Sequence, residues 1–378
     1  MWSRLDAGAG QDETIERPVW ETGMAQREWL DLAGESAMLA WRLPVIRFRG
    51  SSGRPGAYLQ AALHADEQPG VAALHELAKL LTKAEAEGRL LRDVTLVPYA
   101  NPIGLHQVVD GRHMGRFHLA SGTNFNRAFP LPPIEQSAGK PAPAERPVPP
   151  RPDQALKAAL ARLAAGSDVI VDLHCDKEAA LYAYCHAELW PGARDLAARL
   201  GVAAMLLWAG PEEGGAAFEE AVTIDRLPAT AARPFLAATI ELRGQSDADP
   251  DLARADARGL YELLADRGML SDPAIGPRPA WNGPAVRQDH VVNVGAPALG
   301  ALLFECQVGA RVVEGQCLAR ILAAPGDEAG EVEVLAPAAG LLLIRARDRL
   351  ARPGETIATL ITDRPAKGAV IGRTLSNR

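Results

Sequence analysis

Two histidines and a glutamate in this sequence have the types and spacing of a metal site. His64 and Glu67 stand three residues apart in LHADEQPG, which places both side chains on one side of a tight turn or first helical turn. His174 directly follows the apolar run VIVDL. Two imidazoles and a carboxylate are the protein ligands of one type of catalytic zinc site, in which water takes the fourth position. We therefore expect these residues to bind one Zn²⁺ per chain, with Asp172 as the partner that orients an imidazole.

A further ionisable residue, Glu241, shares its place in the local pattern with the two histidines. His64 follows the apolar run AYLQAAL, His174 follows VIVDL, and Glu241 stands near the end of LAATIEL. In open α/β sheets, ligands bind outside the carboxyl ends of the strands. Groups placed at three such ends are expected to converge on one site.

The segment GRFHLASGTNFNRAFP carries groups that suit an anionic amide substrate. Arginine binds a carboxylate through two parallel hydrogen bonds, which makes Arg127, beside Asn126, a candidate for gripping a substrate carboxylate. The plain alternative is a turn asparagine beside a surface arginine. Arg116 is the candidate for stabilising the oxyanion that develops on an amide carbonyl, and Arg112 competes with it for that role.

The cysteines, the tryptophans and the other histidines are expected to be structural. None of the four cysteines forms a C-x-x-C pair, which argues against a zinc knuckle or a thioredoxin-type motif. Trp208 is expected to pack in the interior. His106, His113, His118 and His186 are expected to be loop or surface residues, and His118, the closest of them in sequence to Asn126 and Arg127, is the alternative candidate for lining the pocket.

Short apolar runs alternate along the chain with longer segments of helical spacing. The expected strands cover 57–63, 94–99, 169–173, 204–209 and 236–242, and the expected helices cover 70–90, 153–165, 192–200 and 251–267. Such alternation is typical of an α/β domain whose helices cover a mainly parallel or mixed sheet.

Composition divides the chain into regions. Residues 1–43 are expected to form an N-terminal arm, 44–272 a catalytic domain with a proline-rich insertion at 130–152, and 285–364 a small all-β domain. Within the last region, the segments that begin at Gly300 and Gly340 form a weak internal repeat, similar to the halves of the barrel-sandwich hybrid of biotinyl and lipoyl domains. No lysine occurs from 301 to 366 for such a domain to modify, so we expect a structural or gating cap instead of a swinging arm.

The overall charge and hydropathy exclude some partners. The formal net charge is −7 and the pI about 5.7, which argues against nucleic acid or an anionic membrane surface as a partner. No apolar stretch of about 20 residues is present to span a bilayer. The N-terminus has no apolar h-region of a signal peptide, so a cytoplasmic location is expected.

In their order along the chain, the motifs LHADE, NFNR, VDLHCD and TIELRG resemble the succinylglutamate desuccinylase/aspartoacylase family. The resemblance covers roughly residues 44–270 and implies a zinc carboxypeptidase-like (phosphorylase/hydrolase-like) fold. Family members usually read H-G-x-E at the first ligands, where this chain has Ala65 and Asp66 in the middle positions. The roles that the resemblance implies are zinc binding by His64, Glu67 and His174, substrate binding by Asn126 and Arg127, proton transfer by Glu241, and a second family arginine at Arg116.

These observations favour a zinc-dependent deacylase that cleaves the amide bond of a small N-acyl amino acid or related amine. A metallocarboxypeptidase acting on short peptides would use the same zinc and glutamate. A non-catalytic binding protein on a hydrolase scaffold is a third hypothesis, although all four residues of the machinery are present. The acyl group, the amine and homo-oligomer formation stay open.

Overall fold

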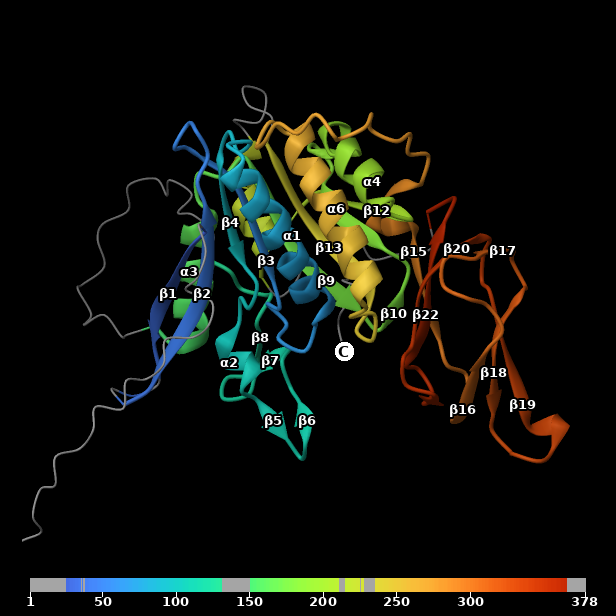
Figure 1. The fold of residues 1–378 in the computed structure, drawn as a ribbon. Coiled ribbons are helices and arrows are strands. Elements are labelled where there is room, and N and C mark those ends of the chain that lie inside the picture. Colours follow the sequence, from blue (N-terminus) through green and yellow to red (C-terminus); the bar gives the residue numbers. More distant parts are fainter. Residues whose placement is uncertain are drawn as a thin grey trace, which may run out of the picture.

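The computed structural model describes residues 25–34, 36, 38–130, 150–210, 215–224, 226, 227 and 235–365. They form a large α/β unit with a smaller all-β module at one end (Figure 1). Nearly all of the proline-rich segment at 130–152 lies outside the described residues. In the described part of the chain, no helix is both long and apolar enough to cross a membrane.

A nine-stranded mixed sheet forms the centre of the large unit. Its strand order is β1-β2-β4-β3-β9-β13-β11-β12-β14. The neighbours from β4 through β3 and β9 to β13 are parallel, whereas β1, β2 and β11 introduce antiparallel pairs. The strands are β1 (Gln26–Ala33), β2 (Ala40–Phe48), β3 (Pro55–Ala61), β4 (Asp93–Val97), β9 (Val169–Asp176), β11 (Tyr182–His186), β12 (Ala204–Trp208), β13 (Leu236–Gly244) and β14 (Ala285–Arg287). The expectation of an α/β unit with a large mixed sheet is confirmed.

Helices cover both faces of this sheet because neighbouring strand residues point to opposite sides. Leu59 packs into one core and Tyr58 into the other, and both are fully buried. One core lies under α1 (Pro69–Ala86), α4 (Arg194–Leu200) and α6 (Pro250–Asp266), and the other under α3 (Pro152–Ala164) and α5 (Phe218–Ile224). The loop between β4 and α3 carries α2 (Pro102–Leu105) and two short hairpins, β5 (Val108–Val109) with β6 (Arg112–His113) and β7 (Phe117–His118) with β8 (Thr123–Asn124).

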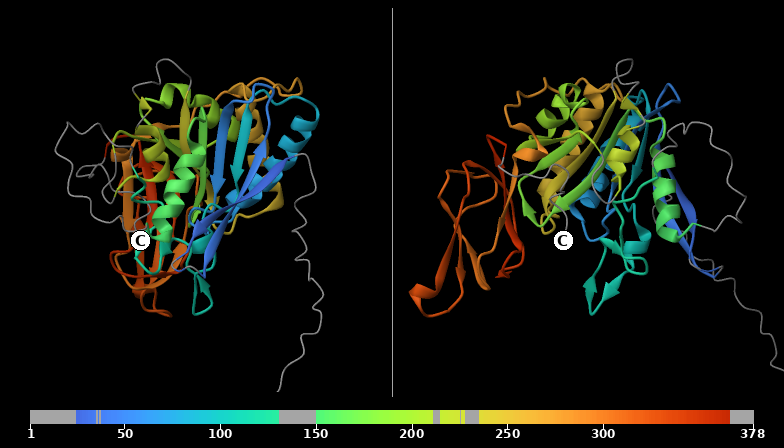
Figure 2. Two further views of the ribbon diagram at one scale, coloured as in Figure 1. Left: turned by 90° about the vertical axis from the view of Figure 1, so that its left-hand side faces the viewer. Right: turned by 180° about the vertical axis from the view of Figure 1, so that it is seen from behind.

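The all-β module packs two small sheets around a core of its own (Figure 2). The strands of one sheet are β15 (Val291–Gly295), β17 (Arg311–Val312), β20 (Gly340–Arg345) and β22 (Thr356–Thr362), and β10 (Glu178–Ala179) of the large unit joins them. The other sheet holds β16 (Gly300–Phe304), β18 (Cys317–Leu322), β19 (Glu331–Leu335) and β21 (Leu350–Ala351). The pairs β16·β18 and β20·β22 correspond to the two segments of the internal repeat. The likeness to biotinyl and lipoyl domains stays a prediction.

The ordered sheet extends beyond the boundaries expected from composition. At one edge of the sheet, all eight residues of β1 pair with β2, so the described part of the chain already has regular structure at Gln26–Ala33, before residue 44. Residues 1–24 of the expected arm lie outside the described residues. The domain limits at 44–272 and 285–364 stay a prediction. Two strands cross these limits, because β14 pairs within the large sheet and β10 of the large unit pairs with the module.

Candidate active site

The candidate residues meet at one edge of the sheet because three neighbouring parallel strands end there. β3, β9 and β13 lie side by side, and Glu241 of β13 is directly opposite His174 of β9. His64 follows β3 by three residues, after a turn in which Ala62 has a φ of 54°. The convergence expected from the strand ends is therefore present.

His64, Glu67 and His174 form a buried cluster with the donor set of a metal site. One ligand atom from each residue lies within 4.8 Å of the others. Nδ1 of His64 is 3.0 Å from Oε1 of Glu67, and Nδ1 of His174 is 2.8 Å from its Oε2. Each of the three residues is at most 3% exposed. Two imidazole nitrogens and a carboxylate at this spacing fit a zinc ion with three protein ligands.

Each imidazole is held by a second partner through its other ring nitrogen. Nε2 of His64 is 2.9 Å from Oδ1 of Asn124, an oxygen that also accepts the Asn126 backbone N–H, so the imidazole nitrogen is the donor. Nε2 of His174 donates to Oδ2 of Asp172 at 3.0 Å. Both rings thus present Nδ1 to Glu67, the orientation that leaves this nitrogen for a metal.

The partner of His174 belongs to a buried hydrogen-bonded network. Oδ1 of Asp172 accepts from Gln60 at 2.9 Å, and Tyr58 donates to Gln60 at 2.7 Å. All three side chains have no exposed surface. Such a fully paired network fixes the orientation of the imidazole.

The charges of the cluster shift its pKa values in opposite directions. Burial raises the pKa of Glu67, but His64 and His174 outweigh it and hold that pKa well below its usual value. Burial lowers the pKa of His174, whereas the carboxylates of Asp172 and Glu67 raise it well above the ordinary value. Burial and the nearby Arg116 lower the pKa of His64.

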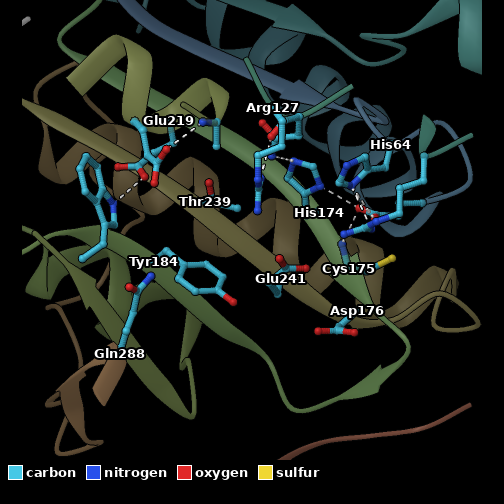
Figure 3. A pocket seen from close by; sticks show the side chains of 16 residues that line it. His64, Arg127, His174, Cys175, Asp176, Tyr184, Glu219, Thr239, Glu241 and Gln288 are labelled. Atoms are coloured by element: carbon cyan, nitrogen blue, oxygen red, sulfur yellow. Dashed lines mark hydrogen bonds and ion pairs between the residues drawn. The ribbon is translucent and has the colours of Figure 1, made fainter. Parts of the chain in front are cut away.

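Glu241 has the titration behaviour of a proton-transfer group. Burial, together with the carboxylates of Glu67 and Asp176, raises its pKa to about 8, against the opposing effect of His174 and Arg116. A carboxyl group whose pKa lies near neutrality is suited to accept a proton and to return it. Its side chain points into the pocket beside the cluster (Figure 3).

The arginines differ in their relation to the cluster. Nη1 of Arg116 is 3.1 Å from Oε1 of Glu67 and 3.2 Å from Nδ1 of His64. Arg127 lines the same pocket, and its Nη1 donates to the backbone oxygen of Asn126 at 2.7 Å. Arg112 lies in the exposed β6 strand and does not line this pocket.

Asn126 connects the candidate substrate site to α5. Its Oδ1 accepts the backbone N–H of Phe218 at 2.8 Å, and its Nδ2 lies 3.2 Å from Nε2 of His174. Helix α5 was not expected from the sequence, although its first residues form one wall of the pocket. The position of Asn126 therefore depends on contacts 48 and 92 residues away along the chain.

The pocket has a second end that the sequence did not indicate. Trp208, expected to be a packing residue, lines it, and its Nε1 donates to Oε2 of the buried Glu219 at 2.7 Å. In Figure 3, Glu219, Tyr184 and Gln288 lie on the side away from His64. The lining residues missing from the sequence-based set are Cys175, Asp176, Tyr184, Trp208, Ala217, Glu219, Glu220, Thr239 and Gln288.

Cys175 and His118 have structural environments. Cys175 lines the pocket, but burial, Glu67 and Glu241 raise the pKa of its thiol, which makes it an unreactive group. His118 is buried away from the lining, with Nδ1 2.9 Å from Oγ of Ser121. It is not among the residues that line the pocket.

Comparison with known proteins assigns a family to most of the large unit. The family model of the succinylglutamate desuccinylase/aspartoacylase catalytic domain matches residues 54–267, more than half of the chain. No curated protein matches the chain at a significant level.

Solved structures resemble the whole chain and not the matched region alone. Two are proteins named for the same family, from Shewanella frigidimarina NCIMB 400 and Shewanella amazonensis SB2B. Both are 23% identical, with TM-scores of 0.72 and 0.74, and the alignments cover 90% and 89% of this chain and 97% and 99% of theirs. A third is the ectoine utilization protein EutE (DoeB) from Ruegeria pomeroyi with product bound, at 21% identity, a TM-score of 0.64, and coverage of 89% of this chain and 94% of that one. At such identities the likeness establishes the fold alone.

Proposed function

Because the chain belongs to the succinylglutamate desuccinylase/aspartoacylase family of amide hydrolases, we propose that it is a zinc-dependent deacylase of small N-acyl amino acids or related amines. The observation that carries this proposal is the buried cluster of His64, Glu67 and His174 beside Glu241. These groups come from three strand ends and share one small pocket.

The donor set supports zinc as the cofactor. His64, Glu67 and His174 would hold the ion, and Asn124 and Asp172 would orient the two imidazoles. When bound, zinc lowers the pKa of a coordinated water to about 7 and polarises the scissile carbonyl. Nitrogen and carboxylate ligands also accept cobalt or manganese, so the metal itself needs to be measured.

Glu241 is the proposed proton-transfer residue. Its carboxylate takes a proton from the attacking water and later delivers it to the departing amine nitrogen. The raised pKa supports both steps, because the group can hold the proton between them near neutral pH.

Two arginines are proposed to handle the negative charges of substrate and intermediate. Arg116, next to Glu67 and His64, is placed to donate hydrogen bonds to the oxygen that becomes negative in the tetrahedral intermediate. Arg127 and Asn126 are proposed to bind the carboxylate of the amino acid.

A combined metal and substrate assay tests this function. Purified protein is analysed for bound metal and then screened against N-acetyl, N-formyl and N-succinyl amino acids and against short peptides. We expect about one zinc per chain and release of free amino acid that stops on chelation and returns with zinc. Preferential removal of C-terminal residues from peptides would support the carboxypeptidase hypothesis instead. Bound zinc without hydrolysis of any compound would support the non-catalytic one.

A further inference from the structure

The C-terminal β module is fastened to the large unit close to the candidate active site. Strand β10, which begins two residues after the last residue of the His174 strand, pairs with β20 of the module (Figure 1). A buried apolar cluster spans the junction, with Tyr182 and Leu206 on one side and Leu343 on the other. Contacts of this kind hold the module in one position.

Three arginines at alternate positions of the module reach across this junction. Nε of Arg345 and Nη2 of Arg349 bind the two carboxylate oxygens of Glu178 at 2.5 and 2.6 Å. The arginine between them, Arg347, takes a different partner, because its Nη1 donates to Oε1 of Gln245 at 2.5 Å. Docking thus has its own ion pairs, and Arg347 is not needed for it.

Gln245 links Arg347 to the loop that carries His64 and Glu67. Its Nε2 donates to Oδ2 of Asp66 at 3.0 Å, and its backbone N–H donates to the Asp176 backbone oxygen at 3.0 Å. The two ends of the amide are distinguished by their partners, an arginine donor at the oxygen and a carboxylate at the nitrogen. Arg347 therefore fixes which way the amide faces.

The Asp66 carboxylate depends on this single partner. Among the described residues, only Gln245 hydrogen-bonds to it, and Oδ1 of Asp66 is buried without a partner. A buried acceptor that loses its last hydrogen bond is costly, so the loop would rearrange if the amide turned. The residue that follows Asp66 is the ligand candidate Glu67.

The other side of the same loop is held by a backbone hydrogen bond and a close backbone approach. The Ala65 backbone N–H donates to the Gly115 oxygen at 3.0 Å, and a Cβ at Gly115 would lie 2.3 Å from the Asp66 nitrogen. The segment from His64 to Glu67 is thus held between the β6–β7 connection and Gln245.

We propose that the C-terminal module is a positioning part of the hydrolase site: Arg347 acts through Gln245 on Asp66 and so fixes the loop that carries His64 and Glu67. This inference rests on the proposed function in that the loop is taken to carry metal ligands. It assigns the module a task that neither a swinging arm nor a passive cover would have.

Four variants separate the effect of the Arg347–Gln245–Asp66 contacts from the effect of module docking. Arg347→Met removes the donor, and Arg347→Lys keeps a donor and the charge. Gln245→Glu keeps a partner for Arg347, now as an ion pair, but loses the donor to Asp66. Arg352→Met is the control, because Arg352 is exposed and its ion pair with Glu355 lies within the module.

Two measurements are made on every variant. Amide hydrogen exchange of the peptide that covers residues 64–68 is followed in metal-free protein, with β20 and β22 as the internal test that the module remains docked. The zinc dissociation constant is measured by chelator competition. Loss of a partner that orients a metal ligand costs about 10–100-fold in affinity, and for this more remote contact we expect about 10-fold.

The expected result is faster exchange at 64–68 and weaker zinc binding in both Arg347→Met and Gln245→Glu, with Arg347→Lys and Arg352→Met close to wild type. Unchanged exchange and affinity in Arg347→Met would overturn the proposal. So would wild-type behaviour of Gln245→Glu beside a defective Arg347→Met, because the effect would then come from docking. A wild-type protein that binds no zinc would refute the proposed function, while the exchange comparison would still decide the role of the Arg347–Gln245–Asp66 contacts.

Discussion

Replacing Glu241 by glutamine tests the proposed chemistry most directly. The side chain keeps its size and its place opposite His174 in the sheet but can no longer accept a proton from water. It is not one of the three residues of the metal cluster, so zinc content is expected to stay at the wild-type level. Binding and chemistry can therefore be separated in one variant.

The expected loss of activity follows from the role of a proton-transfer group. Such groups contribute about 10²–10⁴-fold to the rate, which corresponds to about 3–5 kcal/mol of transition-state stabilisation. We expect kcat for the best N-acyl amino acid to fall by this factor and KM to change little. The matched control is Glu219→Gln, which changes another buried pocket carboxyl whose oxygen is bound to Trp208. That variant is expected to lose less than about tenfold.

The same substitution is expected to change how the free energy of unfolding of the metal-free protein depends on pH. The folded protein raises the pKa of Glu241 to about 8 from an ordinary 4.5, so it favours the neutral form. This contribution to stability is complete below pH 4.5 and is lost as the pH rises through 8. The loss amounts to at most about 5 kcal/mol, at about 1.4 kcal/mol per pKa unit. Glutamine stays neutral, so the variant gains stability relative to wild type between pH 5 and 9.

Kinetics, zinc analysis and urea unfolding of chelated protein at pH 5, 7 and 9 measure these effects. Full zinc content with near wild-type kcat would refute the assignment of Glu241 as the proton-transfer residue. A stability difference that does not depend on pH would refute the raised pKa and, with it, the reason for expecting the group to hold a proton near neutrality.

Three further substitutions test the rest of the site. Arg127→Gln is expected to lower kcat/KM by about 10–100-fold for substrates with a free carboxylate, the value of a lost charge-assisted hydrogen bond, and to have little effect on the corresponding amides. Asn124→Ala removes the acceptor of His64 and is expected to weaken zinc binding about 10–100-fold in chelator competition, whereas Asn124→Asp keeps an acceptor and stays near wild type. Gly115→Ala places a Cβ 2.3 Å from a backbone nitrogen of the metal loop and is expected to cost about 1–3 kcal/mol in urea unfolding, whereas Gly276→Ala, with open space around it, costs much less. Equal unfolding free energies for the two alanine variants would contradict the close approach at Gly115.

The grouping of His64, His174 and Glu241 at one edge of the sheet was predictable because its signal is local. An apolar run followed by a polar ligand marks the carboxyl end of a strand, and parallel neighbours bring such ends to the same edge of a sheet. His64, His174 and Glu241 each carry that mark, and β3, β9 and β13 are adjacent. Periodicity likewise predicted α1 and α6, whose apolar faces repeat at helical spacing.

Which of the remaining polar groups share the pocket depends on contacts between segments that are distant in the chain. Asn124 and Gln245 are ordinary residues in the sequence, and they gain a role from partners 60 and 179 residues away. Helix α5 was not predicted from the sequence, yet it brings Glu219 to the pocket.

The chemistry available at the strand ends could therefore be predicted without coordinates, because ligand types and strand patterns are properties of short segments. The order of the strands, the antiparallel insertion of β11 beside β13, and the link from Arg347 to Asp66 depend on the fold. These features arise when segments distant in the chain bury their apolar faces together, and no local pattern records which segments will meet.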